Sequence, residues 1–204
     1  ACSCVRDAQE TAHSRRVSEF LQTVVLDGEH TNGELSSEEV GERGRELCGD
    51  DHAIIGNLLT TRASALAVSG RLDEGITAQR EALEFLREAH GEHHASVAAA
   101  MTKLAEYHEE RRDIKEAEEL YRQALGLKSE LFDQDSTEIA DAMESLTSLL
   151  VETGNLAHDE IKSLWRKTVQ AYSASLGPEA PTTVKQLCEM SCWLMNNGYT
   201  EEAG

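Results

Sequence analysis

The feature that most restricts the fold of this chain is an internal repeat with a period of 42 residues. Residues 49–90 align without a gap on residues 91–132, and they share glycines, histidines and small residues at matched positions. The matched pairs include Gly49 with Gly91, His52 with His94, and Ala63 with Ala105. Residues 133–176 continue the series with two extra residues near Ala157, and a partial fourth unit spans 177–204. Such a period indicates an array of similar units that bury their apolar faces against their neighbours.

Each unit is expected to hold two amphipathic helices of about four turns, because apolar residues recur at spacings of three and four. Short turns separate the helices, and Gly70, Gly154 and Gly198 occupy matched places where a left-handed residue can end a helix. Small residues at further matched places would let paired helices approach closely. These are Ala63, Ala105, Thr147 and Ser191 on the first helices, and Gly75 and Ala117 on the second helices.

Composition agrees with a helical fold and restricts the partners. Hydrophobic residues make up 40% of the chain, and aromatic residues, which strands favour, only 4%. The formal net charge of −19 predicts an acidic surface that repels nucleic-acid phosphates and anionic membrane faces. No apolar run approaches the roughly 18 residues that a membrane helix requires, so no direct membrane insertion is expected. The expected partner is therefore another protein.

Five cysteines, an odd number in a chain long enough to bury its own core, favour a reducing compartment over a disulfide framework. Cys188 and Cys192 lie four apart on an expected helix, where idle or buried thiols, a metal site and oxidation are alternatives. The expected localisation is intracellular and soluble. Because residue 1 is Ala rather than Met, we expect the chain to be a processed protein or a piece of a longer one from which targeting information can be missing.

The stretch AHGEHH concentrates three potential metal ligands, His90, His93 and His94. Two interpretations compete: a metal site, which would open the way to a metal-dependent enzyme, and a structural junction. His94 and His52 occupy the same place in successive units, just before a first helix, whereas later units have no histidine there. The three histidines also cross a helix boundary and lack an obvious fourth ligand. The sequence therefore favours a junction, and neither a metal nor a cofactor is expected.

These features together resemble the tetratricopeptide repeat family, specifically the 42-residue type found in kinesin light chains. The resemblance rests on the small-residue positions above, on the EAEELYRQAL helix at 116–125, and on large apolar residues at Leu59, Met101, Met143 and Leu187. It implies an all-α fold, a right-handed superhelix (α-solenoid) of antiparallel helix pairs. The repeats would cover 49–204, divided into 49–90, 91–132, 133–176 and a partial 177–204. Residues 1–48 would supply N-terminal helices that cap the array.

In such a superhelix the first helix of each unit lines a concave face, which the resemblance implies as the partner-binding surface. The candidate residues there are Asn57, Thr61, Ser64, Lys103, Glu106, Glu110, Asp141, Glu144, Ser148, Glu152 and Cys192. The chain departs from the paired asparagines that kinesin light chains often carry at these places. Because most of the charges are negative, we expect a basic segment to bind, unless the carboxylates only form a solvated face. Binding that survived charge reversal at Glu106 and Glu110 would contradict this expectation.

Catalysis is not expected, because the chain has no HExxH, no GxSxG and no phosphate-binding glycine loop. The prediction is a non-catalytic protein–protein interaction module. The alternatives are a structural or spacer subunit that packs by its ends and convex face in a larger assembly, and a regulatory repeat region of a larger signalling protein. The fourth unit stops before its second helix is complete, so we expect the molecule to continue in a longer chain, to dimerise at this open C-terminal end, or to be covered there by a partner.

Overall fold

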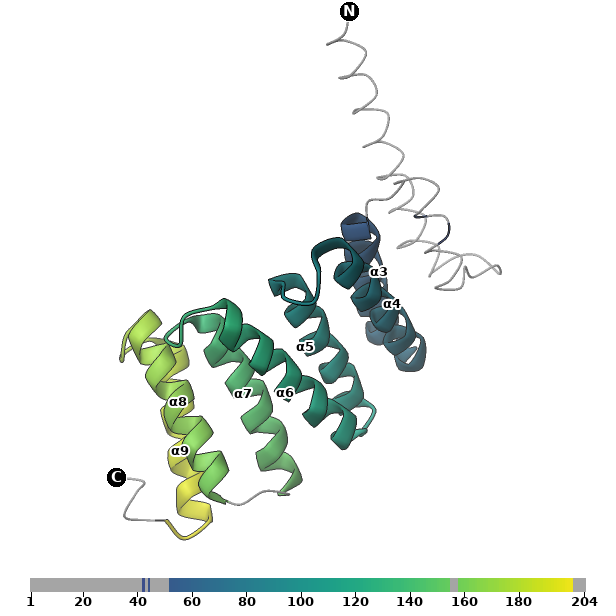
Figure 1. Cartoon of the computed structure of the whole chain (residues 1–204). Coiled ribbons are helices and arrows are strands. Elements are labelled where there is room, and N and C mark those ends of the chain that lie inside the picture. Colours follow the sequence, from purple (N-terminus) through teal and green to yellow (C-terminus); the bar gives the residue numbers. More distant parts are fainter. Residues whose placement is uncertain (1–41, 43, 45–51, 155–157, 200–204) are drawn as a thin grey trace, which may run out of the picture. The chain divides into compact units, whose positions relative to one another are not determined.

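The computed structural model describes residues 42, 44, 52–154 and 158–199, with seven α-helices within 52–154 and 158–199 and no strand among the described residues (Figure 1). The helices are α3 (His52–Val68), α4 (Leu72–His90), α5 (Ala95–Glu110), α6 (Ile114–Leu131), α7 (Thr137–Thr153), α8 (His158–Leu176) and α9 (Pro181–Asn196). The predicted all-α fold of consecutive helix pairs is confirmed, with two helices in each of the first three units. The predicted helices before residue 48 lie outside the described residues, apart from the helical Glu42 and Gly44.

The chain divides into two compact units, residues 1–107 (unit 1) and 108–204 (unit 2). Within the described residues, unit 1 holds α3, α4 and most of α5, and unit 2 holds the last residues of α5 together with α6, α7, α8 and α9. In unit 2 each helix packs on the next, α6 on α7, α7 on α8 and α8 on α9. Each unit therefore contains its own candidate surface residues.

In unit 1, α3 and α4 pack antiparallel with almost no space between their backbones. A Cβ atom added to Gly56, near the start of α3, would lie 2.7 Å from Leu86 Cγ, near the end of α4. At the other end of the pair, a Cβ on Gly75 would lie 3.0 Å from the Ala63 carbonyl oxygen. Small residues are thus required where the two helices approach, as the sequence predicted for Ala63 and Gly75.

The core of unit 2 is built from the apolar stripes of its helices. Its fully or almost fully buried side chains include Ala117, Tyr121, Ile139, Leu146, Leu149, Leu150, Ile161, Trp165, Tyr172 and Leu194. They recur at spacings of three, four and seven, so each helix turns one side to its neighbours and leaves the other to solvent. On α7 and α9 the other side carries exposed residues such as Asp141, Ser148 and Glu189.

The turns after the first helices have the same backbone conformation in all four sequence repeats. Gly70, Gly154 and Gly198 have φ of 83°, 60° and 84°, as predicted, and Arg112 takes the same place with φ of 70°. Such a left-handed residue lets the next amide turn back onto the helix end. In three of these turns a backbone amide donates to a carbonyl five residues earlier at 2.9 Å. The pairs are Arg71 with Leu66, Asp113 with His108, and Tyr199 with Leu194. Glycine is therefore preferred at this turn position because of its backbone conformation, and the second repeat has an arginine, Arg112, at the same position.

Candidate partner-binding surfaces

The three candidates on α3 lie along one side of that helix. Asn57 and Thr61 are exposed, and the Thr61 hydroxyl donates to the Asn57 carbonyl at 3.0 Å. Ser64 is half-buried, and its hydroxyl lies 3.1 Å from the hydroxyl of Tyr107 on α5. This contact places the first helices of two successive repeats side by side within unit 1. The predicted alignment of first helices therefore holds for this pair.

Lys103 and Glu106 on α5 form an ion pair, with the Lys103 ammonium 2.6 Å from the Glu106 carboxylate. The hydrogen bond to Glu106 is the main cause that raises the pKa of Lys103 above its ordinary value. Because both side chains are well exposed, solvent weakens this pair. Glu106 is therefore an accessible carboxylate, but a basic partner must share or displace Lys103 to reach it.

In unit 2 a single tyrosine joins two of the candidate carboxylates. The Tyr172 hydroxyl on α8 lies 2.5 Å from Asp141 Oδ1 and 2.7 Å from Glu144 Oε2, both on α7. Burial raises the pKa of Tyr172 well above its ordinary range, and the two neighbouring carboxylates add to the effect. The neutral hydroxyl has one proton, so it donates to one carboxylate at a time. Two negative groups are thereby held side by side on the surface of α7.

Glu144 is also fixed from α9. Lys185 and Gln186 donate to Glu144 Oε1 at 3.0 Å and 2.7 Å, and the buried Gln186 accepts a hydrogen bond from the Trp165 indole at 3.2 Å. The same Gln186 amide lies 3.1 Å from Glu189 Oε2. We call Asp141, Glu144, Glu189 and Lys185 the α7–α9 acidic surface. Three carboxylates against one ammonium leave it with an excess of negative charge.

The remaining candidates are more dispersed. Glu152, near the end of α7, is paired with Arg112 at 2.5 Å. Glu110, Ser148 and Cys192 are exposed, and Glu110 has no ion-pair or hydrogen-bond partner among the described residues. Cys188 is exposed as well. The alternative that Cys188 and Cys192 are buried thiols is therefore wrong.

Two residues that organise the acidic surface were not among the predicted candidates, Tyr172 and Gln186. Both are buried, and neither faces solvent as a binding residue is expected to do. The sequence does single out Gln186, because the equivalent positions in the two preceding repeats are Ala100 and Ala142, and a polar residue replaces these alanines. No periodicity indicates that the Tyr172 hydroxyl reaches α7.

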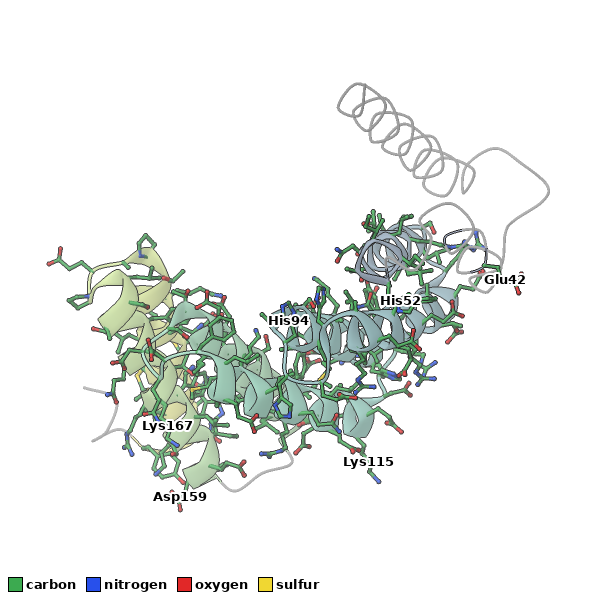
Figure 2. The ribbon with its side chains drawn as sticks, turned by 45° about the horizontal axis from the view of Figure 1, so that its top comes forward. Glu42, His52, His94, Lys115, Asp159 and Lys167 are labelled. Atoms are coloured by element: carbon green, nitrogen blue, oxygen red, sulfur yellow. The ribbon has the colours of Figure 1, made fainter. Side chains whose placement is uncertain are left out.

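The histidine cluster lies at the junction between α4 and α5, as the sequence favoured, and Figure 2 labels His94 there. His94, which directly precedes α5, accepts a hydrogen bond at Nδ1 from the Ser96 backbone amide at 3.2 Å. Ser136 takes the matched place before α7 and accepts from the Ile139 amide at 3.4 Å. His90 stacks on His94 with ring centroids 4.2 Å apart. Among the described residues, no three His, Cys, Asp or Glu side chains are placed to hold a metal ion.

Consecutive antiparallel helix pairs with matched turns define a helical repeat protein. Residues 54–130 match the family model described as tetratricopeptide repeat. This match, together with the solved structures below, confirms the predicted resemblance to kinesin-light-chain-like tetratricopeptide repeats. A search of the curated proteins finds no match. In the described part of the chain, no helix is both long and apolar enough to cross a membrane.

Two groups of solved structures have a similar fold. Two crystal structures of the nearly identical TPR-like repeats of a Podosopora anserina protein assigned as a kinesin light chain, one of them carrying a single substitution, have a TM-score of 0.68 and 17% identity. They cover 97% of this chain, which in turn spans 88% and 89% of theirs. The structure of BtubC (BKLC) from P. vanneervenii has a TM-score of 0.67 and 17% identity, covering 97% of this chain and 86% of that one. At 17% identity, the likeness shows a shared fold alone.

Proposed function

We propose that this chain is a non-catalytic interaction module that binds a basic segment of another protein at the α7–α9 acidic surface. In this proposal residues 49–204 form the repeat array and residues 1–48 cover its first unit. Tetratricopeptide repeats generally mediate protein–protein interactions, so the family match at 54–130 supports the class of function. The choice of a basic segment rests on the local geometry of unit 2.

The observation that carries the proposal is the fixed position of Glu144. Gln186 donates to one carboxylate oxygen at 2.7 Å, the Tyr172 hydroxyl lies 2.7 Å from the other and donates to it or to Asp141, and both residues are buried. A carboxylate that is already ordered loses little conformational freedom when a partner binds, which favours affinity. The exposed Lys185 ammonium, 3.0 Å from Glu144, supports a basic ligand at this site. An incoming lysine or arginine would bind beside it at Asp141 and Glu189, or replace it.

The experiment is titration of the 204-residue chain with a fluorescent peptide rich in lysine and arginine, at low and high salt. We expect saturable binding that weakens as salt rises, because exposed ion pairs are screened over about 8–10 Å at physiological ionic strength. In the double variant Asp141→Asn, Glu189→Gln, binding should fall by about tenfold or more, since two favourable charges are removed and the side-chain shapes remain.

A matched control separates this surface from the general acidity of the chain. The double variant Glu116→Gln, Glu119→Gln removes the same two charges from exposed positions of α6. Equal loss of binding in the two variants would mean that net charge alone attracts the peptide, and it would overturn the proposed site. Absence of any binding at low salt would overturn the basic-segment proposal itself.

A further inference from the structure

A buried histidine occupies a position where the other repeats have leucine. His108, near the end of α5, is only 1% exposed. The equivalent residues of the other three repeats are Leu66, Leu150 and Leu194, and all three are buried. Histidine can take up a proton near neutral pH, whereas leucine cannot. The second repeat therefore has an ionisable ring where the others have a purely apolar side chain.

The His108 ring contacts an arginine of the turn after α5 and the carboxylate at the start of α6. Asp113, the N-cap residue of α6, has its Oδ2 atom 3.3 Å from His108 Nδ1. The Arg111 guanidinium lies 3.5 Å from the same ring nitrogen and also donates to Asp113 Oδ2. This bond from Arg111 is the main cause that holds the pKa of Asp113 below its ordinary value. The carboxylate is therefore ionised and already paired with a cation.

The neighbouring helices contribute further ionisable groups near this turn. Glu109 of α5 accepts from the Tyr121 hydroxyl of α6 at 2.7 Å. Glu152 of α7 is paired with Arg112 at 2.5 Å. The charges that act most directly on the ring are therefore those of the turn itself. The remaining charged residues around the turn are exposed to solvent, and they are Glu110, Lys115 and Glu116.

A positive charge on His108 is unfavourable in this arrangement. The side chain is almost fully buried, and removal of a charge from water favours the neutral form. A protonated ring would also repel the Arg111 guanidinium, 3.5 Å away, and compete with it for one carboxylate. The attraction to Asp113 is weakened by solvent, because that side chain is 33% exposed. The closed turn therefore holds the neutral imidazole.

The turn that follows His108 also has a strained backbone. Arg112 has a φ of 70° where the other repeats have glycine, a conformation that a side chain makes unfavourable. Such a residue persists where surrounding contacts fix it. One of these contacts is the ion pair of Arg112 with Glu152 on α7. Another is the hydrogen bond from the Asp113 amide to the His108 carbonyl at 2.9 Å. Loss of these contacts would let the strained turn relax.

We propose that His108 is an acid-sensitive switch, in which protonation of the ring opens the turn between α5 and α6. In the open turn the imidazole is hydrated and takes up its proton near the ordinary histidine value of about 6.5. The open form thus binds more protons than the closed form, so the closed turn is most stable above about pH 6.5 and loses stability as pH falls. Opening relieves the strain at Arg112 and releases it from Glu152. This control is additional to the proposed binding of a basic segment and does not rest on it.

The test is amide hydrogen exchange of the 204-residue chain, measured by NMR between pH 7.5 and 5.5. The Asp113 amide reports opening of this turn, and the Arg71 amide, which makes the matched bond to Leu66, is the internal control. After correction for the intrinsic effect of pH on exchange, the open fraction at Asp113 should rise about tenfold, which is the gain that one histidine proton gives over this range. The open fraction at Arg71 should stay the same.

His108→Leu is the decisive variant, because it introduces the residue that the other three repeats have at this position. It should keep the helical circular dichroism and abolish the pH response at Asp113. His93→Gln is the matched control, since His93 is exposed at the α4–α5 junction, and this variant should keep the response. An open fraction at Asp113 that does not rise in acid, or a rise that persists in His108→Leu, would overturn the inference.

A second measurement needs no variant. The ring resonances of His108 should show protonation at a lower pH than the ordinary histidine value of about 6.5. Protonation at or above that value would show that Asp113 stabilises the charged ring, and it would overturn the switch. The basic-segment titration is made at one pH and is read independently of both results.

Discussion

The indole nitrogen of Trp165 on α8 lies 3.2 Å from the side-chain oxygen of Gln186 on α9, and both residues are buried. The amide nitrogen of the same glutamine lies 2.7 Å from Glu144 on α7. One buried amide therefore joins three helices and connects the interior of unit 2 to its acidic surface. Gln79, at the position equivalent to Trp165, donates to the Ala100 carbonyl at 3.1 Å in unit 1. The same register position thus joins successive repeats in both units.

Replacing Trp165 by Phe tests this connection. The ring stays apolar, but the Gln186 oxygen loses its donor inside the core, which costs about 1–3 kcal/mol of stability. Urea unfolding followed by circular dichroism should show the loss. In the peptide titration, binding at the acidic surface should also weaken, because Glu144 is less firmly held. A variant with unchanged stability would mean that water or a shifted side chain replaces the indole.

Tyr172 predicts a dependence of stability on alkaline pH. Its pKa is raised above the ordinary value of 10.0, mainly by burial, so the folded state favours the neutral hydroxyl. Its contribution to stability is therefore complete below pH 10 and falls as pH rises further. The variant Tyr172→Phe should be less stable than the wild type at pH 7, and the difference should shrink above pH 10. Urea midpoints measured between pH 7 and 11 provide the check, and parallel pH profiles would contradict it.

Gly154 and Gly126 form a matched pair of glycines with opposite expected effects. Gly154 ends α7 with a φ of 60°, where a side chain costs about 1–2 kcal/mol, so Gly154→Ala should destabilise the chain by that amount. Gly126 lies within α6 with open space around its Cβ position, so Gly126→Ala should stabilise by roughly 0.5–1 kcal/mol. Thermal or urea unfolding of the two variants decides the sign, and a shared direction would refute the conformational explanation.

Gly56 is a third case, in which space rather than backbone conformation decides. It lies inside α3, where alanine is intrinsically the better helix former. An added methyl group would nevertheless meet Leu86 Cγ at 2.7 Å and the Ala82 carbonyl oxygen at 3.2 Å. Gly56→Ala should therefore destabilise by about 1–3 kcal/mol, the usual cost of overpacking. Equilibrium unfolding tests this, with Gly126→Ala as the control for helix propensity; a stabilised Gly56→Ala would show that α4 can move away.

The sequence by itself determined the repeat and the class of fold. A period of 42 residues fixes where helices begin and end, because the same breakers recur at Gly70, Gly154 and Gly198. It also located the junction role of His94 and the close approach of Ala63 and Gly75. These properties depend on local backbone conformation and on the periodic burial of apolar residues, and both can be recognised in the order of residues along the chain. The non-glycine turn at Arg112 was not foreseen, because arginine carries no signal for a left-handed φ.

Only the tertiary structure decided which candidate residues act together. Asp141 and Glu144 were predicted as separate groove positions, yet the hydroxyl of Tyr172, about thirty residues later, lies within hydrogen-bond distance of both. Glu106, Glu144 and Glu152 were predicted as open carboxylates, yet each is paired with a cation in the fold. Side-chain partners depend on distances between helices and on rotamers, which a repeat register does not encode.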